Sequence, residues 1–149
     1  MGKISKELQV GKAGEYLAMA DLLLNDRQAF LTDQGLPYDL VFELGDRLIK
    51  IQVKSTRSLK ILNRGYKNKV YSFHVRRAGK NGSRVYDSNE FDGYALVTLD
   101  TRSVYYVPFT ERINRTWLFR DKNTQYKTTN QKTAPYIQDF TLERFLNEI

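Results

Sequence analysis

The feature that most constrains this 149-residue chain is a pair of alternating apolar segments joined by Gly45-Asp46. Residues 38–44 and 47–55 are predicted strands, and glycine at the first position of a two-residue loop favours a type II′ hairpin turn. The numbers of paired residues then sum to 91, which gives the hairpin one uninterrupted apolar face. That face consists of Leu40, Phe42, Leu44, Ile49, Ile51 and Val53. Such a hairpin must be covered by another layer of structure.

Periodic apolar residues predict a helix near each end of the chain. Residues 6–25 repeat apolar side chains every three to five positions, and 141–149 has a similar stripe. Gly11 and Gly14 each weaken the first helix by roughly 1 kcal/mol relative to alanine. Either these glycines are simply tolerated or they allow another segment to approach the helix closely.

Further strands are predicted at residues 28–32, 69–77, 93–99 and 103–109. Residues 114–133 are polar without a clear period, which indicates a loop or an inserted binding segment. The order of helix, strands and helix predicts an α/β fold that borders on α+β, with a mixed central sheet flanked by helices. No repeat or linker divides the chain, so we expect residues 1–149 to form a single domain.

Composition excludes several kinds of site. Cysteine is absent, which excludes disulfide scaffolds, Cys-based zinc sites and Cys nucleophiles. His74 is the single histidine, which argues against a His-rich metal site. No apolar run approaches the roughly 18 residues that span a bilayer, and the N-terminus lacks an apolar secretory signal. We therefore expect a cytoplasmic protein with no membrane partner.

The net charge of +7 is spread unevenly along the chain. Residues 47–86 contain twelve bases and no acid, and residues 112–132 contain six bases against Asp121. A solvated basic face is the alternative, but such faces usually mix both signs, so we favour binding of a phosphate backbone. The candidate DNA contacts are Ser55, Arg57, Lys60, Arg64, Lys67, Lys69, Arg76, Arg77, Lys80 and Arg84. The Ser55 hydroxyl either donates to phosphate or simply ends the strand.

The predicted register also gathers polar groups on the second face of the hairpin. Asp39 lies directly across from Gln52, with Cβ atoms about 5 Å apart, and Lys54 points to the same face. The Asp39 carboxylate, the Gln52 amide oxygen and the Val53 carbonyl are oxygen ligands of the kind that Mg²⁺ prefers. Lys54 would orient the attacking water or offset charge on the phosphate. The alternative is a surface Asp–Lys pair worth under about 1 kcal/mol.

The same residues carry a family resemblance. Pro37-Tyr38-Asp39, twelve residues and then Gln52-Val53-Lys54 resemble the bipartite signature of the PD-(D/E)XK nuclease superfamily. Glu15 resembles the acidic residue that many members place on the preceding helix. Residues 91–97 and 104–108 are similar to the final core strands of small members. Within the superfamily, the chain most resembles homing endonucleases encoded by group I introns in bacterial transfer-RNA genes.

The resemblance implies a restriction-endonuclease-like fold and a role for each signature residue. Glu15, Asp39, Gln52 and Lys54 would be catalytic, and Asp39, Gln52, Glu15 and Val53 would bind Mg²⁺, for which Mn²⁺ would substitute. Gln52 departs from the signature because it replaces a carboxylate and removes one negative charge from the site. This departure makes Glu15 the candidate for a second charged ligand, or puts a two-metal mechanism in doubt.

The expected function is sequence-specific, Mg²⁺-dependent hydrolysis of phosphodiester bonds in both strands of duplex DNA. One hairpin supplies one active site, so cutting two strands implies a homo-oligomer, either a dimer or a tetramer. A Holliday-junction resolvase or repair-type nuclease of the same fold is one alternative. A non-catalytic basic module that binds nucleic acid is another.

Three smaller features have two interpretations each. His74 is either a satisfied strand residue or a DNA contact. Trp117 is either a core residue or a wedge between bases. Asp87, Glu90 and Asp92 form either a second cation site or a turn before a strand.

Overall fold

The computed structural model of the chain describes residues 6–33, 35–61, 68–75, 90–113, 115–126 and 134–149, and the backbone of 77–79 and 82–84. Two helices, α1 (Lys6–Leu24) and α2 (Leu142–Glu148), lie near the ends of the chain, and a short 3₁₀ helix, η2 (Ile137–Asp139), precedes α2. The strands are β1 (Ala29–Leu31), β2 (Leu40–Leu44), β3 (Arg47–Thr56), β4 (Tyr71–His74), β5 (Arg77–Gly79), β6 (Gly82–Arg84), β7 (Gly93–Thr98), β8 (Ser103–Pro108) and β9 (Thr116–Phe119). None of the described helices is long and apolar enough to cross a membrane.

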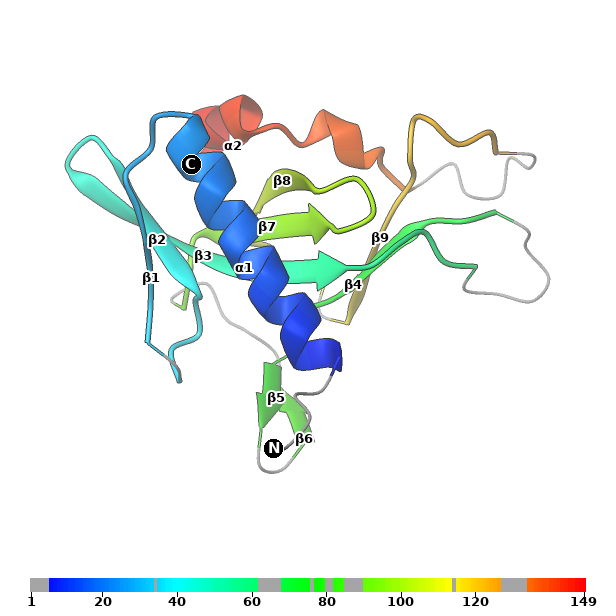
Figure 1. Ribbon diagram of the computed structural model, residues 1–149, viewed down its shortest axis with the longest axis horizontal. Coiled ribbons are helices and arrows are strands. Elements are labelled where there is room, and N and C mark those ends of the chain that lie inside the picture. The colour runs from blue at the N-terminus through cyan, green and yellow to red at the C-terminus, as the bar shows by residue number, and fades with distance from the viewer. Residues whose placement is uncertain are drawn as a thin grey trace.

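A mixed five-stranded sheet in the order β1-β2-β3-β7-β8 forms the centre of the fold (Figure 1). Strands β1, β2 and β3 run antiparallel to one another, β3 and β7 pair in parallel, and β7 and β8 form a second hairpin. The predicted α/β to α+β class with a mixed central sheet is therefore confirmed, and its best description is α+β. Two-stranded sheets of β4 with β9 and of β5 with β6 complete the described strands.

The first hairpin has the register that the sequence predicts. Leu40 pairs with Ile51 and Leu44 pairs with Arg47, so paired numbers sum to 91. Gly45 has a φ of 62°, the left-handed value that a type II′ turn requires at its first position. This register matters for the site because β3 continues to Thr56, whereas its pairing with β2 ends at Ile51.

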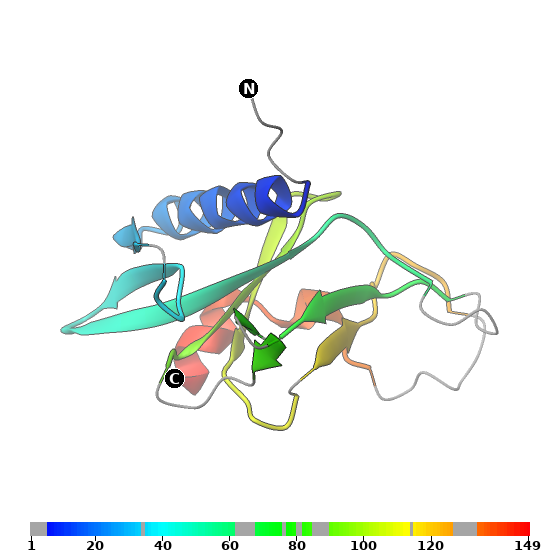
Figure 2. The ribbon, with the colours of Figure 1, turned by 90° about the horizontal axis from the view of Figure 1, so that it is seen from below.

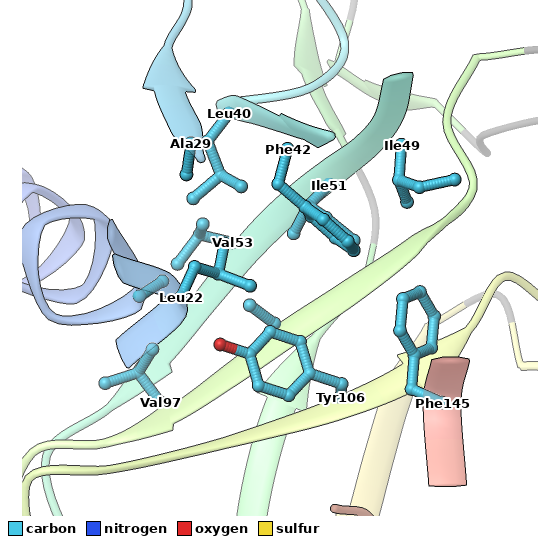
Figure 3. Close-up of a cluster of buried hydrophobic side chains, with 12 residues drawn as sticks. Leu22, Ala29, Leu40, Phe42, Ile49, Ile51, Val53, Val97, Tyr106 and Phe145 are labelled. Atoms are coloured by element: carbon cyan, nitrogen blue, oxygen red, sulfur yellow. The ribbon is translucent and has the colours of Figure 1, made fainter. Parts of the chain in front are cut away.

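Helix α1 lies on one side of the central sheet and covers the apolar face of the hairpin (Figure 2). Ala18 and Leu22 of this helix are fully buried, in a cluster with residues of β2, β3, β7 and β8 (Figure 3). Phe145 of α2 joins the same cluster beside Tyr106. The predicted C-terminal helix is confirmed, and the Thr141 hydroxyl caps it by accepting from the Arg144 N–H at 3.2 Å.

The opposite face of the sheet is covered by β4 and β9, which corrects two predictions. Residues 69–77 do not form one strand: β4 ends at His74, and Arg77 begins β5. The supposed loop 114–133 contains β9, which pairs antiparallel with β4. A strand of four residues is too short to show a clear apolar period. Its partner strand lies more than forty positions away in the sequence, so no local pattern predicts β9.

Two contacts of α1 define how it sits on the sheet. The buried Tyr106 hydroxyl donates to the Asp21 carboxylate at 2.6 Å, which ties the helix to β8. Gly14 packs directly on β3, because a Cβ added there would lie 1.7 Å from Ser55 Oγ and 3.0 Å from Ser55 Cβ. Of the two interpretations of the helix glycines, close approach therefore holds at Gly14. Gly11 has nothing within 4 Å of an added Cβ, so there the glycine is merely tolerated.

The two glycines predict opposite effects of the same substitution on stability. Overpacking costs about 1–3 kcal/mol, whereas alanine gains up to about 1 kcal/mol in helix propensity. Gly14→Ala should therefore lower the free energy of unfolding, and Gly11→Ala should raise it. In a Ser55→Gly background, Gly14→Ala should no longer cost stability. Urea unfolding of these variants measures both effects, and equal changes at the two glycines would contradict the packing described here.

Candidate active site

The Asp39 carboxylate lies beside the part of β3 that extends beyond the end of β2. The Asp39 N–H donates to the Ile51 carbonyl at 2.8 Å and so continues the strand pairing by one residue. One carboxylate oxygen, Oδ2, then accepts the Val53 N–H at 2.8 Å. A side chain thus takes the place of a neighbouring strand. Because the N–H and C=O of one strand residue point to the same side, the Val53 carbonyl also points toward this gap.

Gln52 adjoins Asp39, as the predicted register requires. Its Nε2 donates to Asp39 Oδ2 at 2.8 Å, and the Gln52 residue is only 9% exposed. The amide therefore presents its nitrogen to the carboxylate, whereas a metal ion needs its oxygen. Ligation by Gln52 would require the amide to turn over, which exchanges the two atoms without moving the rest of the side chain.

Glu15 reaches the same place from α1, one residue after the close contact at Gly14. The pKa of Asp39 is raised to about 6, chiefly by burial and then by the charge and hydrogen bonding of the nearby Glu15 carboxyl. The hydrogen bond from Val53 and the positive charge of Lys54 oppose the rise. Two carboxyl groups in one partly buried site repel each other when both are ionised, so a cation bound there would reduce this repulsion.

Two lysines stand near the carboxylates. Lys54 lies two positions beyond Gln52 on β3, and burial lowers the pKa of its ammonium while the Asp39 carboxylate opposes that shift. Lys12 lies on α1, and its Nζ is 3.0 Å from Glu15 Oε2. A Lys and a Glu three positions apart commonly pair on one face of a helix. The proximity of Glu15 to Asp39 follows only from the packing of α1 on the sheet.

A cavity of about 260 Å³ opens beside the carboxylates. It lies between α1 and the segment that links β1 to β2, and its lining includes Lys12, Glu15, Thr32, Leu36 and Asp39. A larger cavity of about 450 Å³ lies between the end of α1 and α2 and is lined by none of these groups. Of these two cavities, the smaller one is therefore the one that adjoins Asp39 and Glu15.

The structure describes the side chains of only some of the candidate DNA contacts. Arg57, Lys60 and Lys69 are exposed. The Ser55 hydroxyl is instead buried against Gly14, and a phosphate contact would require it to leave the helix packing. The remaining predicted contacts cannot be placed as side chains. Arg64, Lys67, Arg76 and Lys80 lie outside the described residues, and Arg77 and Arg84 are described only as backbone partners in β5 and β6.

Of the three smaller features, the structure describes His74, Trp117 and Asp92, whereas Asp87 lies outside the described residues. His74 is an exposed strand residue paired with Thr116. Trp117 packs against Tyr94, with ring centroids 6.1 Å apart, which supports the core interpretation. Asp92 extends the pairing of β3, since its carboxylate accepts the Lys50 N–H at 2.8 Å and its own N–H donates to the Lys50 carbonyl at 2.9 Å.

The donor set around Asp39 fits a hard divalent cation. Among the described residues, no group of three or more Asp, Glu, His or Cys side chains gathers at one point. The site instead offers two carboxylates, one amide and one backbone carbonyl beside an open cavity. Mg²⁺ usually binds through one or two carboxylates and keeps several waters, so this set is sufficient for it.

Comparison with known proteins identifies the family. The family model for PD-(D/E)XK endonucleases matches residues 5–143, nearly the whole chain. The chain belongs to the PD-(D/E)XK endonuclease family. A bacterial homing endonuclease, I-Ssp6803I, has a similar solved structure, with a TM-score of 0.68 and 18% identity over 97% of this chain and 95% of the other. At that identity the likeness shows a shared fold. A search of curated protein sequences found no match.

Family membership confirms the resemblance drawn from the sequence, and the structural match confirms the restriction-endonuclease-like fold. In this PD-(D/E)XK endonuclease, both halves of the predicted signature lie at one point of the sheet. Asp39 stands at the start of β2, and Gln52, Val53 and Lys54 occupy the stretch of β3 just beyond the end of β2.

The raised pKa of Asp39 predicts that this carboxylate destabilises the metal-free protein. Its pKa of about 6 lies above the value of 3.8 for the unfolded chain, so its stabilising contribution is present at low pH and is lost as pH rises through 6. Asp39→Asn keeps an acceptor for the Val53 N–H. In EDTA, this variant should be more stable than the parent at pH 7.5, and the difference should shrink toward pH 4. A difference that does not change with pH, measured by urea unfolding, would contradict the assignment.

Proposed function

We propose that this PD-(D/E)XK endonuclease is a sequence-specific, Mg²⁺-dependent enzyme that hydrolyses both strands of duplex DNA, as a homing endonuclease does. The observation that carries the proposal is the Asp39 carboxylate, which bonds to the Val53 N–H at 2.8 Å beside Glu15 and Lys54. Two carboxyl groups that line an open cavity, with a partly buried ammonium close by, form the arrangement that metal-assisted phosphodiester hydrolysis needs.

Asp39, Glu15, Gln52 and the Val53 carbonyl would hold the ion, with Mn²⁺ able to replace Mg²⁺. When bound, Mg²⁺ supplies a Lewis acid that stabilises negative charge on the phosphate and makes water a better nucleophile at neutral pH. Gln52 contributes a neutral oxygen where the family signature has a carboxylate. The site therefore holds one negative charge fewer, which favours one tightly bound ion over two.

The protein's own groups have separate tasks in the reaction. Lys54 orients the attacking water and offsets the charge that builds on the phosphate, and it is most effective in a site from which water is largely excluded. Burial lowers the pKa of that ammonium, and the Asp39 carboxylate opposes this shift. The Val53 N–H fixes the orientation of Asp39, which lines the cavity together with Glu15.

The basic segment after β3 supports DNA as the substrate. Arg57 and Lys60 are exposed directly beyond the end of β3, and residues 47–86 contain no acid. Exposed cations of this kind are the groups to which a phosphate backbone binds. Because the chain has one such site, cutting both strands needs two copies, so we propose a homo-oligomer whose symmetry matches its target. The similar solved structure is that of a homing endonuclease, which favours this substrate over branched DNA.

Substitution of Lys54 and Asp39 should separate chemistry from binding. Lys54→Met keeps an unbranched side chain and removes the charge, and Asp39→Asn keeps the shape and removes a charged ligand. Each should slow Mg²⁺-dependent cleavage by about 10²-fold or more, with DNA binding and folding retained. Lys50→Met is the matched control, because Lys50 lies on the same strand and face as Lys54 but its ammonium sits over the Tyr38 ring, 5.3 Å from the centroid.

The assay compares linear duplexes that carry candidate target sites with four-way junctions, in Mg²⁺ and in EDTA. The proposal requires cutting of both duplex strands in Mg²⁺ only. Cleavage by either variant at more than about a tenth of the parent rate would show that the residue lacks the assigned role. Preferential cutting of junctions would instead point to a resolvase.

A further inference from the structure

Lys12 forms an ion pair in an unusual setting. Its Nζ lies 3.0 Å from Glu15 Oε2, and the Lys12 side chain is 56% exposed whereas that of Glu15 is 18% exposed. Pairs of this spacing on a free helix surface contribute only about 0.2–0.5 kcal/mol, so helix stability alone gives little reason for the contact. Here, however, the acidic partner is one of the two carboxyl groups of the proposed metal site.

Lys12 also lines the cavity that leads to Asp39, together with Thr32 and Leu36 on the opposite wall. A phosphate group that approaches Asp39 through this cavity passes within the range of the long Lys12 side chain. Lys54 already supplies a cation on the β3 side of the carboxylates, where it is partly buried. Lys12 is thus a second cation, on the α1 side, and the exposed one of the two.

The two charges compete for Glu15. A divalent ion between Glu15 and Asp39 would bring two positive charges close to the Lys12 ammonium, and like charges at such distances repel strongly in a partly buried site. The Lys12 stem is flexible and its head is a compact point charge, so it can turn toward solvent without disturbing α1. In the cavity, the nearest new partner for it would be a DNA phosphate.

We propose that Lys12 is a DNA-backbone contact that metal binding releases. In the metal-free protein Lys12 neutralises Glu15; when a divalent ion takes Glu15, Lys12 turns to a phosphate of the strand being cut. This inference rests on the proposed function, because it assumes that Glu15 is a metal ligand. The Lys12 charge thus has two opposite effects: it weakens metal binding and strengthens DNA binding.

Two binding measurements test these effects on metal and DNA binding in a Lys54→Met background, in which cleavage is expected to be slow. Mg²⁺ titration by calorimetry without DNA should show about two- to fivefold tighter binding after Lys12→Met, because a competing cation of surface ion-pair strength is gone. Binding of target duplex in Mg²⁺ should weaken by about tenfold. The slope of log affinity against log salt should become shallower by about 1. Lys6→Met, which removes an exposed charge at the start of the same helix, is the control and should change neither measurement.

The outcomes distinguish this inference from the proposed function. If the Lys54→Met protein binds Mg²⁺ but Lys12→Met leaves DNA affinity and salt slope unchanged, Lys12 is only a helix-face pair and the inference is overturned. Weaker Mg²⁺ binding after Lys12→Met would overturn it too, because Lys12 would then hold Glu15 in place for the metal. If no variant that keeps Asp39 and Glu15 binds Mg²⁺, the proposed function itself fails, and this inference fails with it.

Discussion

The bond between the Asp39 carboxylate and the Val53 N–H is the interaction on which the site depends. Beyond Ile51, no strand of the described residues lies beside β3 on the β2 side, and a buried backbone N–H without a partner is costly. Asp39 satisfies that donor and thereby becomes fixed in a partly buried place. The same contact brings a carboxylate next to Glu15, which raises the pKa of Asp39 and stores electrostatic repulsion that a cation relieves.

The position of Glu15 depends in turn on how α1 docks. Gly14 allows the helix backbone to lie against Ser55, and the Tyr106 hydroxyl holds Asp21 farther along the same helix. Glu15 follows Gly14 directly, so a small displacement of the helix moves its carboxyl relative to Asp39. Packing residues that never touch a substrate therefore decide whether the two carboxyl groups converge.

The features that were predictable from the sequence are those that local patterns encode. The alternation on both sides of Gly45-Asp46 determines the register, and the register alone brings Gln52 to Asp39. The pairing of β4 with β9 depends on residues more than forty positions apart and leaves no local period.

Only part of the candidate site was predictable from the sequence. The resemblance to a family pointed to Glu15, but only the docking of α1 explains why its carboxyl meets that of Asp39. The different surroundings of Gly11 and Gly14 are likewise tertiary, since both are helix glycines of equal propensity. The orientation of the Gln52 amide depends on a hydrogen bond between side chains and has no signature in the sequence.

We propose that Asp39 and the Val53 carbonyl form a site for a divalent metal ion. Anomalous diffraction from crystals soaked in Mn²⁺ is the sharpest test, because the ion is located without reference to activity. We expect an ion about 2.0–2.2 Å from an Asp39 carboxylate oxygen and from the Val53 carbonyl oxygen, with the Gln52 amide turned so that its oxygen faces the ion. Mn²⁺ bound elsewhere, with Asp39 still held only by Gln52 Nε2 and the Val53 N–H, would contradict it.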